Sequence, residues 1–195
     1  MDEINFDENK EEIWEKFPIL ETERLVLREI RITDKERLFE IWGNPLVNQY
    51  TDFPGLNDPE EVKKFIEMAR ERFETKNGNR WALTLKNDGI LIGTMGFNRW
   101  ITRFGNFAML GYDLDSNYWR KGYSFEAGQA VLDYGFNVMK LHRIEAEIDP
   151  VNIASEKLLL KLGFQLEGIH KERLFFGGKF QTSAMYAILT ADVRK

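Results

Sequence analysis

The feature that constrains this chain most is a turn, Trp119-Arg-Lys-Gly-Tyr-Ser124, which separates an expected strand from an expected helix. Apolar side chains recur on one face over residues 125–138, and this spacing predicts the helix. Gly122 can adopt backbone angles closed to other residues and lets a bulky ligand approach the chain. Because the first N–H groups of a helix are unpaired, Arg120 and Lys121 beside them indicate an anion site, usually for phosphate. The same residues also fit a solvated basic loop that caps a core helix.

A second stretch, residues 149–164, contains Asn152 and Ser155 and ends in Lys-Leu-Gly-Phe. At this separation the two stretches resemble the GNAT acetyltransferases, and most closely the branch that includes the ribosomal-protein N-terminal acetyltransferases. In that family the turn has the general form Q/R-x-x-G-x-G/A, from which Trp119 and Ser124 depart. The longer form Tyr-Trp-x-Lys-Gly-Tyr-x-x-Glu-Ala, which this chain has, is the usual one in the branch.

The resemblance covers residues 21–189 and implies the GNAT fold. This is an α/β (α+β) arrangement in which helices flank a mixed, mostly antiparallel sheet of about six or seven strands. Residue patterns predict strands at 24–28, 80–85, 90–97, 107–114, 143–148, 165–176 and 180–189, and helices at 34–42, 57–76 and 125–138. Thr33 or Asp34 is expected to cap the first helix. The domain prediction is an N-terminal extension over residues 1–18 and a single GNAT acetyltransferase domain over residues 19–195.

Composition narrows the classes of protein and partner. A chain of 195 residues with 43% hydrophobic residues predicts one globular domain, and its net charge of −5 disfavours a basic nucleic-acid surface. Cysteine is absent and only His142 and His170 are present, so no disulfide and no metal site are expected. We see neither a signal peptide nor a membrane-spanning run, which favours a cytoplasmic protein without a membrane partner. A homodimer is left open.

The resemblance implies that acetyl-CoA is the co-substrate and suggests which residues contact it. Leu114 would bind the pantetheine arm through its backbone, where neighbouring strands splay apart, and Asn152 would hold the arm by its side-chain amide. Asn152 also fits ordinary turn and helix-cap chemistry. The pyrophosphate would lie against the turn, at Trp119, Arg120, Lys121, Gly122, Tyr123 and Ser124.

Acetyl transfer needs a neutral amine, a group that takes its proton and a group that relieves the departing thiolate. Many family members protonate the sulfur with a Tyr, but Leu159 stands at that position, and the resemblance gives Ser155 as the hydrogen-bond donor instead. A serine facing solvent is the alternative for Ser155. Glu172 is the candidate base, although Leu174 stands where some relatives have a Glu. Alternatively, a chain of water molecules could carry the proton to solvent without a carboxylate base, because an α-amine has a pKa of about 8 and loses its proton readily.

Strand carboxylates form a wider group of candidates for the base. Such side chains are more often solvated or paired than catalytic. The group comprises Asp113, Glu145, Glu147 and Asp149.

The sequence thus predicts an N-acetyltransferase that moves acetyl from acetyl-CoA to a primary amine. The favoured acceptor is the N-terminal α-amine of a protein, such as a ribosomal protein. Alternatives are a small-amine acetyltransferase, acting on a polyamine or an antibiotic, and a non-catalytic acyl-CoA-binding module. A P-loop nucleotide binder is disfavoured, because its Gly-x-x-x-x-Gly-Lys-Ser/Thr motif is absent.

The resemblance also places the acceptor entrance. Helix 57–76, a loop expected over residues 44–54 and the hairpin around Gly177-Gly178 would frame it. Aromatic side chains in these segments could clamp a flexible peptide end: Tyr50, Phe53, Phe175, Phe176 and Phe180. They could equally be core residues, and one of Phe175 and Phe176 is expected to be, because neighbours on a strand face opposite ways.

Overall fold

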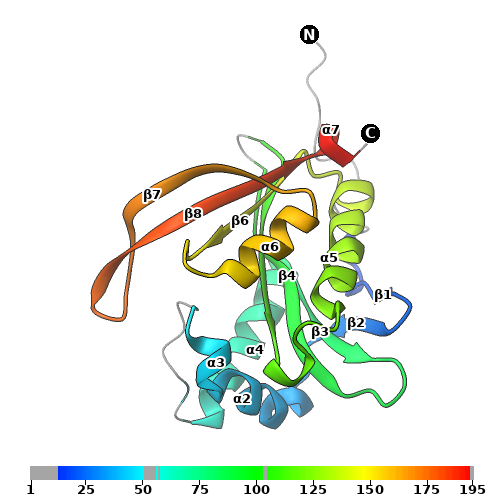
Figure 1. Cartoon of the computed structure of the whole chain (residues 1–195). Coiled ribbons are helices and arrows are strands. Elements are labelled where there is room, and N and C mark those ends of the chain that lie inside the picture. The colour runs from blue at the N-terminus through cyan, green and yellow to red at the C-terminus, as the bar shows by residue number, and fades with distance from the viewer. Residues whose placement is uncertain (1–12, 51–55, 57, 103–104, 194–195) are drawn as a thin grey trace.

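A computed structural model describes residues 13–50, 56, 58–102 and 105–193 (Figure 1). Within them the chain forms a single eight-stranded sheet in the order β1-β2-β3-β4-β5-β6-β8-β7. Only the β5–β6 pair is parallel. The predicted mixed sheet is confirmed, with one strand more than expected, because the short β1 was missed. The strands are β1 (Leu20–Glu21), β2 (Leu25–Glu29), β3 (Asn79–Leu85), β4 (Leu91–Ile101), β5 (Phe107–Leu114), β6 (Arg143–Ile148), β7 (Gln165–Phe176) and β8 (Lys179–Leu189).

Helices cover both faces of this sheet (Figure 1). On β3 the neighbours Ala82 and Leu83 face opposite ways; Ala82 packs in a cluster with α2 and α4, and Leu83 in a cluster with α5 and α6. None of the helices in the described ranges has the length and apolar character needed to cross a lipid bilayer. The helices are α2 (Lys35–Gly43), α3 (Pro45–Asn48), α4 (Pro59–Glu74), α5 (Tyr123–Asp133), α6 (Ile153–Lys161) and α7 (Thr190–Val193).

Two local expectations were wrong. Residues 44–54 were expected to form a loop, yet residues 45–48 form α3, because Asn44 accepts a hydrogen bond from the Leu46 N–H and proline suits the first helical position. Residues 51–54 of this expected loop lie outside the described residues. Asp34 occupies the N-cap position of α2 without capping it. Its carboxylate instead accepts two 2.8 Å hydrogen bonds from Arg28, which are charge-assisted and therefore stronger than a cap.

The predicted N-terminal extension is not wholly separate from the domain. Trp14 is buried and stacks on Trp100 with 5.4 Å between ring centroids, and Phe17 packs on Phe73 and Trp81. Residues 13–18 therefore belong to the packed body, whereas residues 1–12 lie outside the described residues. The boundary at residue 19 stays a prediction.

The sheet parts between its two parallel strands. β5 and β6 pair only from Phe107 opposite Arg143 to Met109 opposite Glu145. Beyond these pairs, residues 110–114 of β5 and 146–148 of β6 have no partner on their facing edges, although β6 continues to pair with β8. The expected splaying of the strands near Leu114 and Glu147 is confirmed, and it leaves backbone N–H and C=O groups available along an open edge.

Candidate functional site

The turn that precedes α5 has an unusual backbone. Arg120 has φ 60° and Gly122 has φ 84°, so two of three successive residues are left-handed. Such angles are uncommon for a residue other than glycine and cost free energy, and they gather at functional sites. Gly122 is the N-cap of α5 and no side chain caps the helix there. The first-turn N–H groups therefore remain available to an anion, next to the exposed Arg120 and Lys121 side chains.

This turn is held from one side by Glu126, in the first turn of α5. The Glu126 carboxylate accepts hydrogen bonds from Thr22 Oγ1 at 2.5 Å, from the Arg24 N–H at 2.8 Å and from Arg24 Nε at 2.7 Å. Arg24 Nη1 also donates to the Lys121 carbonyl at 3.0 Å. Burial alone would raise the pKa of Glu126, but the hydrogen bonds from Thr22 and Arg24 outweigh it and hold the pKa below its usual value.

Sequence reasoning missed Thr22, Arg24 and Glu126 as a group. The available signal was Glu126, which is the glutamate of the quoted Tyr-x-x-Glu-Ala run.

Helix α2 holds the approach to the turn from the other side. Arg37 forms an ion pair with the buried Asp115, whose side chain also accepts from the Asn117 N–H at 2.9 Å. Asn44, just past the end of α2, donates from Nδ2 to Ser116 Oγ at 3.0 Å. Contacts on both sides thus fix the turn before any ligand binds.

Ser155 and Tyr112 meet beside the open edge of β5. Ser155 is only 7% exposed, so the alternative of a serine facing solvent is wrong. Its Oγ lies 2.5 Å from the Tyr112 hydroxyl. Burial raises the pKa of Tyr112 to about 12, against the opposing effect of the Ser155 hydrogen bond, so the phenol is protonated at neutral pH. Sequence reasoning missed Tyr112, because its apolar neighbours Leu110 and Leu114 mark that face of β5 as core.

The two residues expected to hold the pantetheine arm are partly engaged within the protein. Asn152 is the N-cap of α6, and its Oδ1 accepts from the Ser155 N–H at 3.0 Å, which is the helix-cap role left open from the sequence. Its Nδ2 has no hydrogen-bond partner among the described residues and can donate to a ligand. The Leu114 carbonyl accepts from Trp119 Nε1 at 2.8 Å, which explains the Trp in the turn.

Glu172 lies apart from this group. It has φ 52° in the irregular part of β7 between His170 and Leu174, its side chain is exposed, and its N–H donates to Thr182 Oγ1 at 3.5 Å. No hydrogen bond or ion pair within the described residues joins it to Ser155.

Glu147 on β6 lies at the open edge itself, past the last β5–β6 pair. Its Oε1 accepts from the buried Ser183 Oγ at 2.5 Å and is 3.2 Å from Arg173 Nε. Among the strand carboxylates it shares the open edge with Asp113, whose carboxylate accepts from Arg80 and Thr94.

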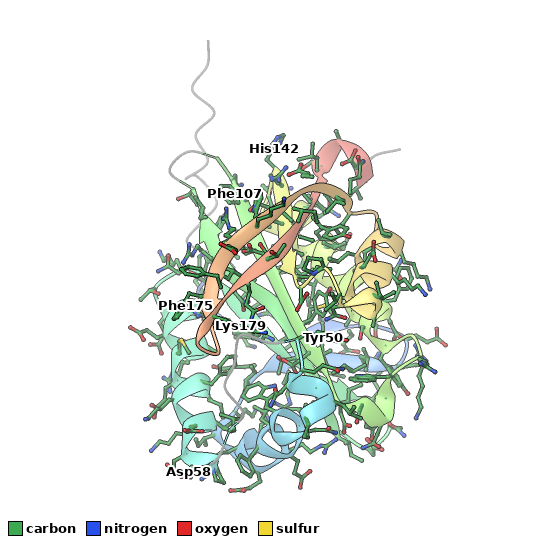
Figure 2. The ribbon with its side chains drawn as sticks, turned by 60° about the vertical axis from the view of Figure 1, so that its left-hand side comes forward. Tyr50, Asp58, Phe107, His142, Phe175 and Lys179 are labelled. Carbon is green, nitrogen blue, oxygen red and sulfur yellow. The ribbon has the colours of Figure 1, made fainter. Side chains whose placement is uncertain are left out.

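Exposed aromatic side chains lie at the tip of the β7–β8 hairpin. Phe175 is 65% exposed and Phe180 62% exposed, and their rings pack edge to face with centroids 5.0 Å apart. Figure 2 shows Phe175 and Lys179 at this tip, which extends beyond the sheet toward α4. Tyr50 is also exposed, whereas Phe53 and the Phe176 side chain lie outside the described part of the chain.

Comparison with known proteins identifies the family. The acetyltransferase (GNAT) domain family matches residues 24–165. The uncharacterized N-acetyltransferase p20 of Bacillus licheniformis is 36% identical over 173 residues, which are 89% of this chain and 97% of that protein. The [ribosomal protein uS5]-alanine N-acetyltransferase of Escherichia coli is 32% identical over 180 residues, covering 89% and 91% of the two chains.

A solved structure shares the fold. The GNAT-family acetyltransferase of Bacillus anthracis superimposes with a TM-score of 0.77 at 30% identity, over 88% of this chain and 98% of that one. This chain therefore belongs to the GNAT acetyltransferases and is an acetyl-CoA-dependent N-acetyltransferase.

Proposed function

We propose that this enzyme acetylates the N-terminal α-amine of a protein in the cytoplasm. The observation that carries the proposal is the open edge between β5 and β6, with the anion-binding turn at one end and the Tyr112–Ser155 pair beside it. One relative at 32% identity is named for acetylating the alanine of a ribosomal protein, which supports a protein acceptor. The exposed aromatic pair at the hairpin tip supports a peptide that reaches the site from outside.

In this proposal acetyl-CoA binds along the open edge. The pyrophosphate lies on the N–H groups of residues 119–124, with Arg120 and Lys121 adding positive charge. The amides of the pantetheine arm pair with the β5 backbone near Leu114 and with Asn152 Nδ2. These contacts present the thioester beside Ser155.

Ser155 then relieves charge on the departing sulfur. The amine attacks the thioester carbonyl, a C–N bond forms, and collapse of the tetrahedral intermediate breaks the C–S bond. An alkyl thiol has a pKa of about 8.5, so full proton transfer from Tyr112, with its pKa of about 12, to the departing thiolate is unfavourable. The two hydroxyls therefore act as a hydrogen-bonded pair that stabilises the thiolate, in the manner of an oxyanion hole.

The amine must lose its proton before it attacks. An α-amine with a pKa near about 8 is partly neutral at physiological pH, so a weak base suffices. Glu172 is the proposed base, and Glu147 is the alternative that the open edge offers. A water chain to solvent would need neither carboxylate.

A panel of acceptors tests the proposed function. We expect short peptides with free N-termini to give higher kcat/KM values than spermidine or free amino acids, measured side by side with acetyl-CoA. A small amine that wins by a wide margin would establish the small-amine alternative. Acetyl-CoA binding without turnover on any amine would point to the non-catalytic binding module.

A further inference from the structure

A pocket of about 520 Å³ lies between the end of α4 and the end of β4. It is not the site of the coenzyme phosphates. β4 and β5 are antiparallel, and the pocket is formed where Ile101 pairs with Phe107, at the opposite end of β5 from the anion-binding turn. Its lining consists of Arg72, Asn77, Asn98, Arg99, Trp100, Ile101 and Thr102.

The charge in this pocket is not balanced. Neither Arg72 nor Arg99 forms an ion pair with any described residue; Arg72 Nη2 only contacts Met68 Sδ at 3.4 Å. Burial, together with the positive charges of Arg80 and Arg99, lowers the pKa of Arg72. In a chain with a net charge of −5, two adjacent arginines without carboxylates leave a positive site that an anion would neutralise.

A β-bulge builds the pocket. Asn98 and Arg99 are neighbours on β4, and neighbours on a regular strand face opposite sides of the sheet. Both line the pocket because the register with β5 shifts between Phe97 and Arg99. Bulges re-aim side chains in this way and are common next to active sites.

The pocket adjoins the reacting edge. Asn98 Oδ1 accepts from Arg80 Nη1 at 2.8 Å, and Arg80 is fixed in turn by Asp113 at 2.8 Å. A Cβ at Gly111 would overlap the Asn98 amide and come within 3.0 Å of Arg80, so these side chains lie directly on the Gly111 backbone. Gly111 precedes Tyr112, whose side chain points to the opposite face and meets Ser155. The pocket is therefore connected, through Asn98 and the Gly111 backbone, to the stretch of β5 that carries Tyr112.

We propose that Arg72 and Arg99 bind a side-chain carboxylate of the acceptor peptide, a few residues after the acetylated amine. The enzyme then prefers N-termini that carry Asp or Glu within their first residues. This inference rests on the proposed function, because it requires a peptide acceptor. A guanidinium pairs with a carboxylate through two charge-assisted hydrogen bonds, which makes Arg suited to this recognition.

The test compares paired peptides that differ only by Glu or Gln at positions two to four. With the wild-type enzyme we expect kcat/KM to be about tenfold to a hundredfold higher for the Glu peptide, the scale of one hydrogen bond to a charged group. The preference should weaken as salt rises. In the double variant R72Q/R99Q the two peptides should become equal, with kcat for the Gln peptide little changed.

Arg70→Gln is the matched control, because Arg70 lies on the same helix and is paired with Glu74 on the surface. It should keep the preference for the Glu peptide. Equal kcat/KM values for both peptides with the wild-type enzyme, or a preference that survives in a folded R72Q/R99Q protein, would overturn the inference while leaving the proposed function intact. Failure to acetylate any peptide would reject the proposed function, and this inference with it.

Discussion

The hydroxyl of Tyr112 lies 2.5 Å from Oγ of Ser155, and this contact joins β5 to α6 where β5 and β6 part. Many members of the family are expected to carry a catalytic Tyr at the position of Leu159, but that side chain is fully buried in the core. Tyr112 instead brings a phenol hydroxyl to the same short helix from strand β5.

Ser155→Ala tests this pair. We expect kcat to fall about tenfold to a thousandfold, the range for one lost donor to a developing negative charge. Affinity for coenzyme A should change little, because Asn152 caps the Ser155 N–H, which the substitution keeps. Steady-state kinetics and calorimetry measure the two quantities.

The matched variant is Tyr112→Phe, which removes one oxygen and keeps the ring. Because the two hydroxyls act as a unit, the double variant should be scarcely slower than Ser155→Ala alone. Equal kcat values for Ser155→Ala and wild type would show that Ser155 takes no part in the mechanism. If the losses in kcat of the two single variants add in the double variant, Tyr112 and Ser155 act independently.

Gly122→Val should weaken coenzyme A binding. A β-branched residue is strained at φ 84°, so we expect the turn to shift away from the ligand, although the added Cβ would itself meet only Arg24 Nη2, at 3.4 Å. Gly89→Val is the control, since Gly89 has a similar φ of 73° in the β3–β4 turn with open space around it. Both variants should lose stability, but only Gly122→Val should lose affinity by calorimetry. Unchanged affinity in folded Gly122→Val would contradict the role of the turn.

Glu172→Gln should reduce kcat/KM about a hundredfold or more near pH 7, the usual contribution of a general base. The deficit should shrink toward pH 9, because the acceptor amine then loses its proton without help. pH profiles of kcat/KM check this. Glu147→Gln serves as the comparison, because its amide oxygen can still accept from Ser183. If only Glu147→Gln lowers kcat/KM in this pH-dependent way, Glu147 on β6 is the base. If neither variant lowers kcat/KM, proton loss through a water chain is favoured.

Glu126→Gln should destabilise the enzyme in a pH-dependent way. The hydrogen bonds from Thr22 and Arg24 depress the pKa of Glu126 in the folded state, so its stabilisation is present above the unfolded pKa of about 4.5. This stabilisation is lost as the pH falls through the lower folded value. Tm should therefore differ between variant and wild type at pH 7, and the difference should close in acid. If the Tm difference between variant and wild type does not depend on pH, packing around Glu126, not its charge, stabilises the enzyme.

The sequence by itself determined what depends on neighbours along the chain. Residues 143–148 were predicted as a strand and match β6, because their alternation follows from strand geometry. The helix predicted over residues 57–76 was also found, as α4, and its start is set locally: Asp58 accepts from the Glu60 N–H two positions on, and Pro59 suits the first helical position. The turn at Gly122 and the family resemblance are of the same local kind.

Tertiary structure decided the contacts that join distant segments. Arg24 and Glu126 are 102 residues apart, and Tyr112 and Ser155 are 43 apart, so no local pattern connects them. The bulge at Asn98 likewise depends on how β4 pairs with β5, and this register is not visible in the residues of β4 alone. Side-chain meetings of this kind depend on how strands align and helices pack, whereas backbone periodicity fixes only which face a residue occupies.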